Sequence, residues 1–317
     1  MVRNNIKLEK VERKVITMYY ATLQLKQGER RALKKLEEFG NNVSRFVPNL
    51  IINDASQETL DLIRQSYTNF VLLDVRHLDS DDVELLEELI QKPENSSFDI
   101  LYPIDYLLNS PQHQLNYVRI NRNVVNPFFT LWLEKNHKNL PNSIMLDFEY
   151  IEGTNQELIS HFFPIIKLLQ EKEIIIMSGA VPNRIPVSSE QNYQFRRIEK
   201  DLYNEIKKIA PSNSKLIFGD YTSVSPILTM GGMAIVQIKY TLEDDYWFVR
   251  NGLRRGNYDF VAVCKQIVNL DNFDEEYCWG DYYIKSVVED NTNKGNPSVW
   301  TSIGVNRHIA VCLNESL

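Results

Sequence analysis

Charged side chains recur near the ends of several short apolar segments in this sequence. Side chains two residues apart lie on the same face of a β-strand, so each segment separates a polar face from an apolar face. Asp74 and Arg76 share the polar face of one segment. Arg119 lies on the polar face of a second segment, and Asp147 and Glu149 share the polar face of a third segment. If these faces meet in the fold, arginines and carboxylates surround one common site.

The carboxylates of this set suit a hard metal ion. Asp147 and Glu149, with Asp220 from a later segment, could hold Mg²⁺ or Mn²⁺ through oxygen ligands. Residues two apart on one strand lie about 7 Å apart at the backbone, a spacing that suits joint binding of one ion. One interpretation of the sequence is therefore a metal site formed by these three residues.

The cations of the set suit an anionic substrate. Lys26, Arg76 and Arg119 could neutralise a phosphate group beside the metal ion. Alternatively, Asp147 and Glu149 could act as acid and base on a sugar-like substrate. A structural role is also open, because buried charges must be paired and the same residues could simply neutralise one another.

These side chains belong to a regular alternation of strand-like and helix-like segments. Strands are predicted at residues 19–26, 46–53, 70–76, 98–105, 116–121, 143–150, 173–178 and 215–221. Helices are predicted at residues 29–39, 56–67, 81–91, 127–137, 154–169 and 190–209, with a capping box at 154–157. This alternation indicates parallel strand pairing and a (β/α)8 TIM-like barrel, with a doubly wound open sheet as the alternative.

The barrel fold assigns a place to the polar residues. The carboxyl ends of the strands form the mouth that carries the active site in such barrels. In the segments described above, the inward polar residues lie late and the inward apolar residues early. The sequence therefore predicts a mouth lined by Lys26, Asp74, Arg76, Arg119, Asp147 and Glu149, with Asp220 as a further candidate.

The chain is expected to divide into three parts. Residues 1–18 form a polar lead-in, residues 19–222 the barrel core, and residues 223–317 a C-terminal elaboration packed on the barrel. Within the elaboration, residues 234–240 and 246–250 are predicted to form a β-hairpin across an acidic turn. The remainder is expected to be helical or irregular.

The composition is that of a globular protein with an acidic excess. Thirty-five Lys and Arg residues against 42 Asp and Glu residues give a formal net charge of −7, which argues against non-specific binding to nucleic acid or to membrane surfaces. No apolar run approaches ~18 residues, so no membrane span is expected. Cys264, Cys278 and Cys312 lie at wide spacings and are expected to be buried, reduced thiols of a cytoplasmic protein.

Four stretches resemble blocks of the beta-protein family of phages and bacteria. They are residues 19–36, 218–221 (FGDY), 238–252 (IKYTLEDDYWFVRNG) and 300–308 (WTSIGVNRH). The family's closing block often carries paired histidines. Here Arg307 stands at the first of these positions, so only His308 carries over. The resemblance adds candidate site residues that match family blocks: Lys26, Glu29, Asp220, Lys239, Arg250 and His308.

Two hypotheses for function remain open. The resemblance implies a setting of phages and of mobile or defence-type bacterial loci, and no particular reaction. The first hypothesis is a metal-assisted hydrolase or transferase that acts on a phosphate-bearing small molecule or nucleotide in phage–host conflict. The second is a non-catalytic recognition protein that binds a phage or host protein through the charged cup or the C-terminal surface.

Overall fold

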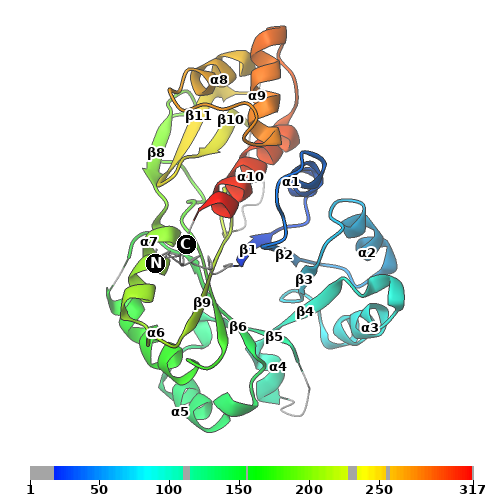
Figure 1. The fold of residues 1–317 in the computed structure, drawn as a ribbon, viewed down its shortest axis with the longest axis vertical. Helices are drawn as coiled ribbons and strands as arrows, with labels where there is room; N and C mark the ends of the chain where they lie inside the picture. Colours follow the sequence, from blue (N-terminus) through cyan, green and yellow to red (C-terminus); the bar gives the residue numbers. More distant parts are fainter. Residues whose placement is uncertain (1–17, 110–114, 155, 228–233, 255–257, 316–317) are drawn as a thin grey trace, which may run out of the picture.

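Eight parallel strands close into a barrel (Figure 1). The computed structural model describes residues 18–109, 115–154, 156–227, 234–254 and 258–315. The barrel strands follow one another around the ring as β1 (Tyr19–Leu23), β2 (Phe46–Ile51), β3 (Val71–Asp74), β4 (Phe98–Pro103), β5 (Tyr117–Asn121), β6 (Ser143–Tyr150), β7 (Glu173–Gly179) and β9 (Lys215–Asp220). Because β9 pairs in parallel with β1, the ring is closed. The predicted (β/α)8 barrel is confirmed, and the open-sheet alternative is wrong.

The barrel interior is filled by alternate residues of its strands. Its apolar layer consists of Tyr20, Val47, Leu72, Leu101, Met145, Ile175, Met177 and Tyr221. A Cβ atom at Gly219 would lie 2.7 Å from Met177 Cε, so a glycine at this position leaves room for the methionine. The opposite strand faces pack against the surrounding helices in the main core. Since the interior is packed, a site for a ligand must lie at an end of the strands.

Helices alternate with the strands and cover the outside of the barrel (Figure 1). They are α1 (Gln27–Glu38), α2 (Gln57–Arg64), α3 (Ser80–Ile90), α4 (Ile104–Asn109), α5 (Pro127–Asn136), α6 (Gln156–Leu168) and α7 (Ile198–Ile209), with 3-10 turns at Pro93–Asn95, Arg122–Val124 and His137–Asn139. Side-chain caps start several of them: Ser56 accepts a hydrogen bond from Thr59 N, and Asn126 accepts one from Phe129 N. The helices in the described part of the chain lack the combination of length and apolar character that crossing a membrane requires.

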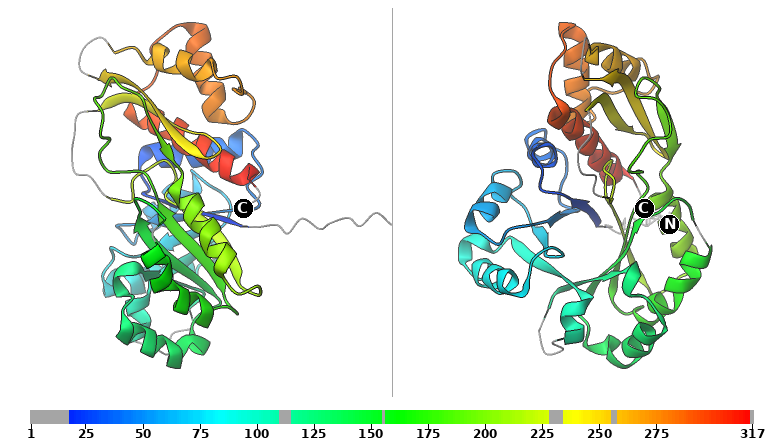
Figure 2. Two further views of the ribbon diagram at one scale, coloured as in Figure 1. Left: turned by 90° about the vertical axis from the view of Figure 1, so that its left-hand side faces the viewer. Right: turned by 180° about the vertical axis from the view of Figure 1, so that it is seen from behind.

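The last helix of the chain completes the outer layer. After β9 the chain forms β10 (Ile235–Thr241), β11 (Asp245–Leu253), α8 (Phe260–Val268) and α9 (Trp279–Asp290) before it returns as α10 (Pro297–Asn314). Helix α10 packs against α1, and its residues Val305, Ile309, Cys312 and Leu313 join the main barrel core (Figure 2). It therefore takes the place of the eighth barrel helix. The other C-terminal elements lie between the last strand and the last helix of the barrel.

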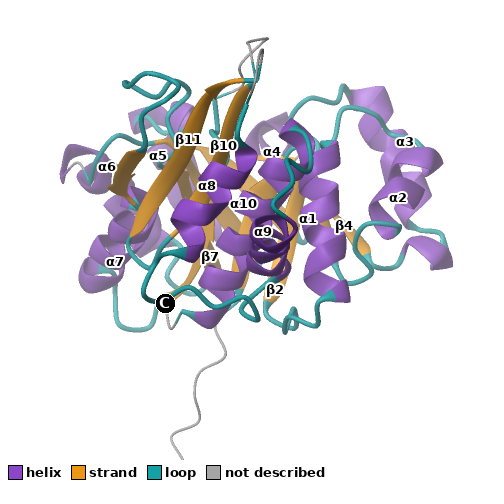
Figure 3. Cartoon of the chain, turned by 90° about the horizontal axis from the view of Figure 1, so that it is seen from above, coloured by secondary structure: helices purple, strands orange, loops and turns teal. Residues whose placement is uncertain are grey.

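The C-terminal elements form a small sheet backed by helices. The predicted hairpin is present as β10 and β11, and β8 (Tyr193–Arg196) pairs antiparallel with β11 to make a three-stranded sheet. One face of this sheet packs against α8, α9 and α10 (Figure 3). On the other face, Phe195 contacts the rings of Tyr246 and Phe248.

Some predicted boundaries are wrong. The helix predicted at 190–209 starts only at Ile198, because residues 193–196 alternate aromatic and polar side chains and form β8 against β11. The strand predicted at 98–105 ends at Pro103, where α4 begins. Two predictions fall partly outside the described residues: the polar lead-in, of which the structure describes residue 18, and the capping box at 154–157, which includes residue 155.

Candidate functional site

Charged side chains from β3, β5 and β6 converge at the carboxyl end of the barrel. Arg119 Nε donates to Asp147 Oδ2 at 2.7 Å, and Asp147 is fully buried. Arg76 forms an ion pair with Asp74, and its Nη2 lies 3.7 Å from Asp147 Oδ2. We refer to these four residues and Glu149 as the mouth cluster. The structure thus brings together five of the residues that the sequence placed at the mouth, and their functional roles stay predictions.

Neutral side chains from three further strands complete the hydrogen bonds of the mouth cluster. Tyr221 Oη donates to Asp147 Oδ2 at 2.6 Å. Asn49 Nδ2 donates to Asp74 Oδ2 at 3.3 Å and to Thr22 Oγ1 at 2.9 Å. Asn49 and Tyr221 carry no formal charge, so the pattern of charged residues did not identify them. Their inward-facing positions on their strands were the available signal.

Glu149 is the exposed and conformationally unusual member of the mouth cluster. Its φ is 56°, in the left-handed region that non-glycine residues seldom adopt, and the pairing of β6 with β7 is interrupted between Asp147 and Tyr150. Its carboxylate accepts a hydrogen bond from Asn121 and lies 3.6 Å from Arg119 Nη2. Its side chain is 31% exposed. Backbone strain of this kind tends to occur at functional sites.

Asp74 and Arg119 of the mouth cluster keep their charges at neutral pH. Burial alone would raise the pKa of Asp74, but the charges of Arg76 and Arg119 and the hydrogen bonds from Arg76 outweigh it and hold that pKa below its ordinary value. Burial would likewise lower the pKa of Arg119, but Asp147 and Asp74 raise it. Arg76 Nε and Asn49 Oδ1 are buried without a hydrogen-bond partner among the described residues. The hydrogen-bonding capacity of the cluster is therefore not fully used within the described part of the chain.

Asp220 does not join the mouth cluster, which corrects the predicted Asp147–Glu149–Asp220 metal site. Phe218, two residues earlier on β9, packs in the core outside the barrel, and Asp220 faces the same side. Tyr221 faces the interior instead. The alternation of faces that correctly assigned the inward residues of the other strands thus also puts Asp220 in the wall between β9 and α10.

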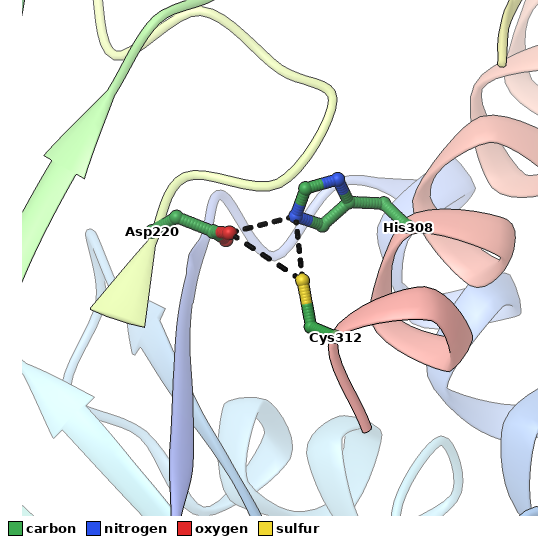
Figure 4. A group of neighbouring side chains, drawn as sticks. All are labelled: Asp220, His308 and Cys312. Atoms are coloured by element: carbon green, nitrogen blue, oxygen red, sulfur yellow. Dashed lines mark hydrogen bonds and ion pairs between the residues drawn. The ribbon is translucent and has the colours of Figure 1, made fainter. Parts of the chain in front are cut away.

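Asp220, His308 and Cys312 meet in the barrel wall, and we call them the wall cluster (Figure 4). His308 Nε2 lies 2.7 Å from Asp220 Oδ2 and 3.3 Å from Cys312 Sγ, and Sγ lies 3.7 Å from Oδ2. Asp220 and His308 are fully buried, and Cys312 nearly so. In the described part of the chain, these three form the one group of potential ligands that could hold a metal ion. The sequence analysis treated Cys312 as an inert thiol, although its spacing of four from His308 puts both on one helix face.

Each residue of the wall cluster also has a hydrogen-bond partner outside the cluster. Tyr19 Oη and Thr222 N donate to Asp220 Oδ1 at 2.7 and 2.8 Å. Thr241 Oγ1 lies 3.1 Å from His308 Nδ1, and Arg197 Nη2 donates to Cys312 Sγ at 3.1 Å. As a result, Oδ2, Nε2 and Sγ are the atoms directed at one another.

The wall cluster lacks the geometry of a nucleophilic triad. In such a triad the acid and the nucleophile bind different nitrogens of the imidazole, so that the ring can relay a proton. Here Asp220 and Cys312 both contact Nε2 of His308. Burial also raises the pKa of Cys312 well above its ordinary value. The arrangement therefore suits ligation better than nucleophilic attack.

The remaining family-matched residues lie apart from both clusters. Lys26 is exposed at the start of α1, and its backbone N donates to Glu29 Oε2 at 3.1 Å. Glu29 is buried, which raises its pKa to about 7 against the opposing effects of a backbone hydrogen bond from Gln24 and the charges of Lys26 and Lys239. Burial lowers the pKa of Lys239 to about 8, with Glu29 opposing. Arg250 Nη1 donates to backbone carbonyl oxygens, among them that of residue 188 at 2.8 Å.

Comparison with known proteins supports the resemblance noted in the sequence. The model of the Beta protein family matches residues 133–314, more than half of the 317-residue chain. The matched range holds Asp147 and Glu149 of the mouth cluster and the whole wall cluster. A search of curated proteins finds no match. On the strength of the family match, the chain belongs to the Beta protein family.

Proposed function

We propose that the chain is an enzyme, a hydrolase or transferase that acts on a phosphate-bearing small molecule or nucleotide at the barrel mouth. The observation that carries this proposal is Glu149, a half-buried carboxylate held in a left-handed conformation among arginines. It lies at the carboxyl end of the strands, where barrels of this type carry their active sites.

The arginines around Glu149 would bind the anionic part of the substrate. Arg122 Nε lies 3.8 Å from Glu149 Oε2, and its side chain is 38% exposed, so a phosphate can reach it from solvent. Arg76 and Arg119 add positive charge beside it, and Arg119 lies between the two carboxylates of β6. Asp147 fixes the orientation of Arg119 through their hydrogen bond.

Glu149 would act as the general acid or base. Its carboxylate can take a proton from an attacking water or hydroxyl group and return it to the leaving group. The predicted Mg²⁺ or Mn²⁺ ion does not fit these residues. Asp147 accepts hydrogen bonds on both oxygens, from Glu149 N on Oδ1 and from Arg119 and Tyr221 on Oδ2, and Asp220 is elsewhere. The proposed chemistry therefore relies on the arginines and Glu149.

The test is ligand binding followed by turnover. Thermal-shift assays with inorganic phosphate, pyrophosphate and a panel of nucleotides should identify a ligand that raises the melting temperature, and phosphate release or mass spectrometry should then follow the reaction. Arg122→Gln should weaken binding, while Glu149→Gln should retain binding and lose turnover. The matched control is Arg196→Gln, which removes an exposed, ion-paired arginine from the small sheet. Binding by none of the panel would contradict the proposal.

The alternative is a recognition protein, and the closed pairing of four mouth residues favours it. Asp74, Arg76, Arg119 and Asp147 form ion pairs with one another, an arrangement that can serve barrel stability alone. In that case a phage or host protein is the partner. Substitutions at the mouth would then change stability, and neither the wild type nor the variants would show turnover.

The biological setting that we propose is phage–host conflict in the bacterial cytoplasm. Its support is the family, whose resemblance implies phages and defence-type loci. Plating efficiency of a phage panel on cells that express the wild type, compared with Glu149→Gln and Arg196→Gln, tests this setting. A plating difference confined to Glu149→Gln would link the mouth to defence. Equal plating in all strains would count against it.

A further inference from the structure

Three kinds of ligand atom converge in the barrel wall at distances close to those of a metal site. Metal–ligand bonds of 2.0–2.3 Å give tetrahedral edges of about 3.3–3.7 Å between ligand atoms. The Nε2–Sγ distance of 3.3 Å and the Sγ–Oδ2 distance of 3.7 Å lie within this range. The Oδ2–Nε2 distance of 2.7 Å is that of a hydrogen bond, and a metal ion that replaces the shared proton would widen it.

The surroundings hold the ligand atoms as outer-shell partners do in metal proteins. Imidazole ligands commonly bind the metal through one nitrogen and a fixed partner through the other, and ligating carboxylates are themselves hydrogen-bonded. His308 has Thr241 Oγ1 at Nδ1, and Asp220 has Tyr19 at Oδ1. This leaves Nε2 and Oδ2 directed at Cys312 Sγ. A small cavity with room for about one water molecule borders Cys312 and Tyr19 and could supply a fourth ligand.

The ligand types select the ion. A thiolate and an imidazole favour Zn²⁺ over Mg²⁺ or Mn²⁺, which prefer oxygen ligands. The carboxylate of Asp220 and the thiolate of Cys312 would neutralise the two positive charges. Binding releases the thiol proton of Cys312, and the proton of His308 then resides on Nδ1, where Thr241 Oγ1 accepts its hydrogen bond.

We propose that Asp220, His308 and Cys312 bind a structural Zn²⁺ ion that ties α10 to the last barrel strand. Asp220 and His308 are 88 residues apart in sequence, so the ion would close the loop that contains β10, β11, α8 and α9. The three ligands are buried between β9 and α10, so the ion would act by linking these two elements, with a water from the adjoining cavity as its fourth ligand. This proposal is independent of the proposed reaction at the mouth, because the two clusters share no residue.

The test uses the full-length chain after treatment with a chelator. Titration with Zn²⁺, followed by gel filtration and elemental analysis, should give about one ion per chain. Titration with Co²⁺ should produce a thiolate-to-cobalt charge-transfer band. Zn²⁺ should raise the melting temperature by about 4 °C at a hundredfold excess over its dissociation constant. Cys312→Ser should lose the band and at least 10-fold in affinity.

Matched controls make the assignment independent of whether Cys312→Ser folds. Cys264 lies in α8 and Cys278 precedes α9, and both are buried outside the wall cluster. The double variant C264S/C278S retains Cys312 as its one cysteine and should keep the full charge-transfer band. Absence of the band in the wild type, or its loss in the double variant, would overturn the proposal. So would a full band in folded Cys312→Ser.

Discussion

The barrel mouth and the barrel wall each hold buried carboxylates, and the two regions give these carboxylates different partners. In the mouth cluster, carboxylates alternate with arginines, so Asp147 has two cations within 4 Å. In the wall cluster, Asp220 faces an imidazole and a thiol, sealed between β9 and α10. The mouth reaches solvent through Glu149 and Arg122, whereas the wall does not.

The difference shows how partners decide what a buried carboxylate can do. A carboxylate that accepts hydrogen bonds from arginines orients those cations, and the set can receive an anion. A carboxylate beside an imidazole and a thiol offers an oxygen to a cation that also binds nitrogen and sulfur. The same fold thus presents an anion-binding surface at the mouth and a cation-binding group in the wall.

The largest effect should come from removing the central carboxylate of the mouth. Asp147→Asn takes the hydrogen-bonded carboxylate from Arg119 and a second carboxylate from Arg76, and we expect a loss of about 5 kcal/mol in the free energy of unfolding. Asp220→Asn in chelator-treated protein should cost less, about 1–3 kcal/mol, because it unpairs no arginine. Urea denaturation of both variants tests the comparison. Equal losses would show that the arginines at the mouth are better solvated than their burial indicates.

Asp74→Asn should cost about 3 kcal/mol at neutral pH, since Arg76 keeps Asp147 at 3.7 Å. The pKa of Asp74 is lower in the folded chain than in the unfolded chain. Its contribution is therefore fully present above the unfolded pKa of about 3.9 and is lost as the pH falls through the folded pKa. The difference in stability between wild type and variant should be constant above about pH 5 and shrink below about pH 4. Denaturation across this range measures it, and a constant difference down to the acid limit would be inconsistent with the lowered pKa.

Much of the fold and part of the site followed from alternation in the strands. Leu72 and Met145 point inward where Asp74 and Asp147 do, so the order of apolar and polar residues along β3 and β6 located the mouth. Applied to β9, the same rule separates Phe218 and Asp220 from Tyr221 and would have placed Asp220 in the wall. The error arose from grouping carboxylates by type rather than by face.

Other features depend on contacts between distant parts of the chain. Residues 193–196 pair with β11, about 50 residues later, and their alternation spans only four residues beside the longer helical pattern that follows. Helix α10 returns to pack against α1, and this return brings His308 and Cys312 to Asp220. The spacing of four between His308 and Cys312 puts both on one face of α10, but only the closed fold shows what that face contacts.

A buried carboxylate outside both clusters sharpens the comparison. Among the described residues no cationic side chain is hydrogen-bonded to Glu29, and burial raises its pKa to about 7. Its contribution is present below the unfolded pKa of about 4.3 and is lost as the pH rises through about 7, the opposite direction to Asp74. Glu29→Gln should therefore be more stable than the wild type by about 2 kcal/mol above neutral pH and show no gain below about pH 4. Melting curves from acid to alkaline pH test this, with Glu38→Gln, an exposed position on the same helix, as the control.

The smallest effect on stability should come from Glu149, although we expect its loss to abolish turnover. Glycine adopts the left-handed φ of 56° without strain, so Glu149→Gly should gain about 1 kcal/mol of stability from the backbone. The variant also gives up the contacts to Arg119 and Arg122, which are 3.6 and 3.8 Å long and partly exposed, and it gains flexibility in the unfolded chain. These terms nearly cancel, so the free energy of unfolding should change by less than about 1 kcal/mol. A large loss of stability in urea would mean that Glu149 holds the arginines in place as Asp147 does. It would then argue against Glu149 as the general acid or base of the mouth cluster.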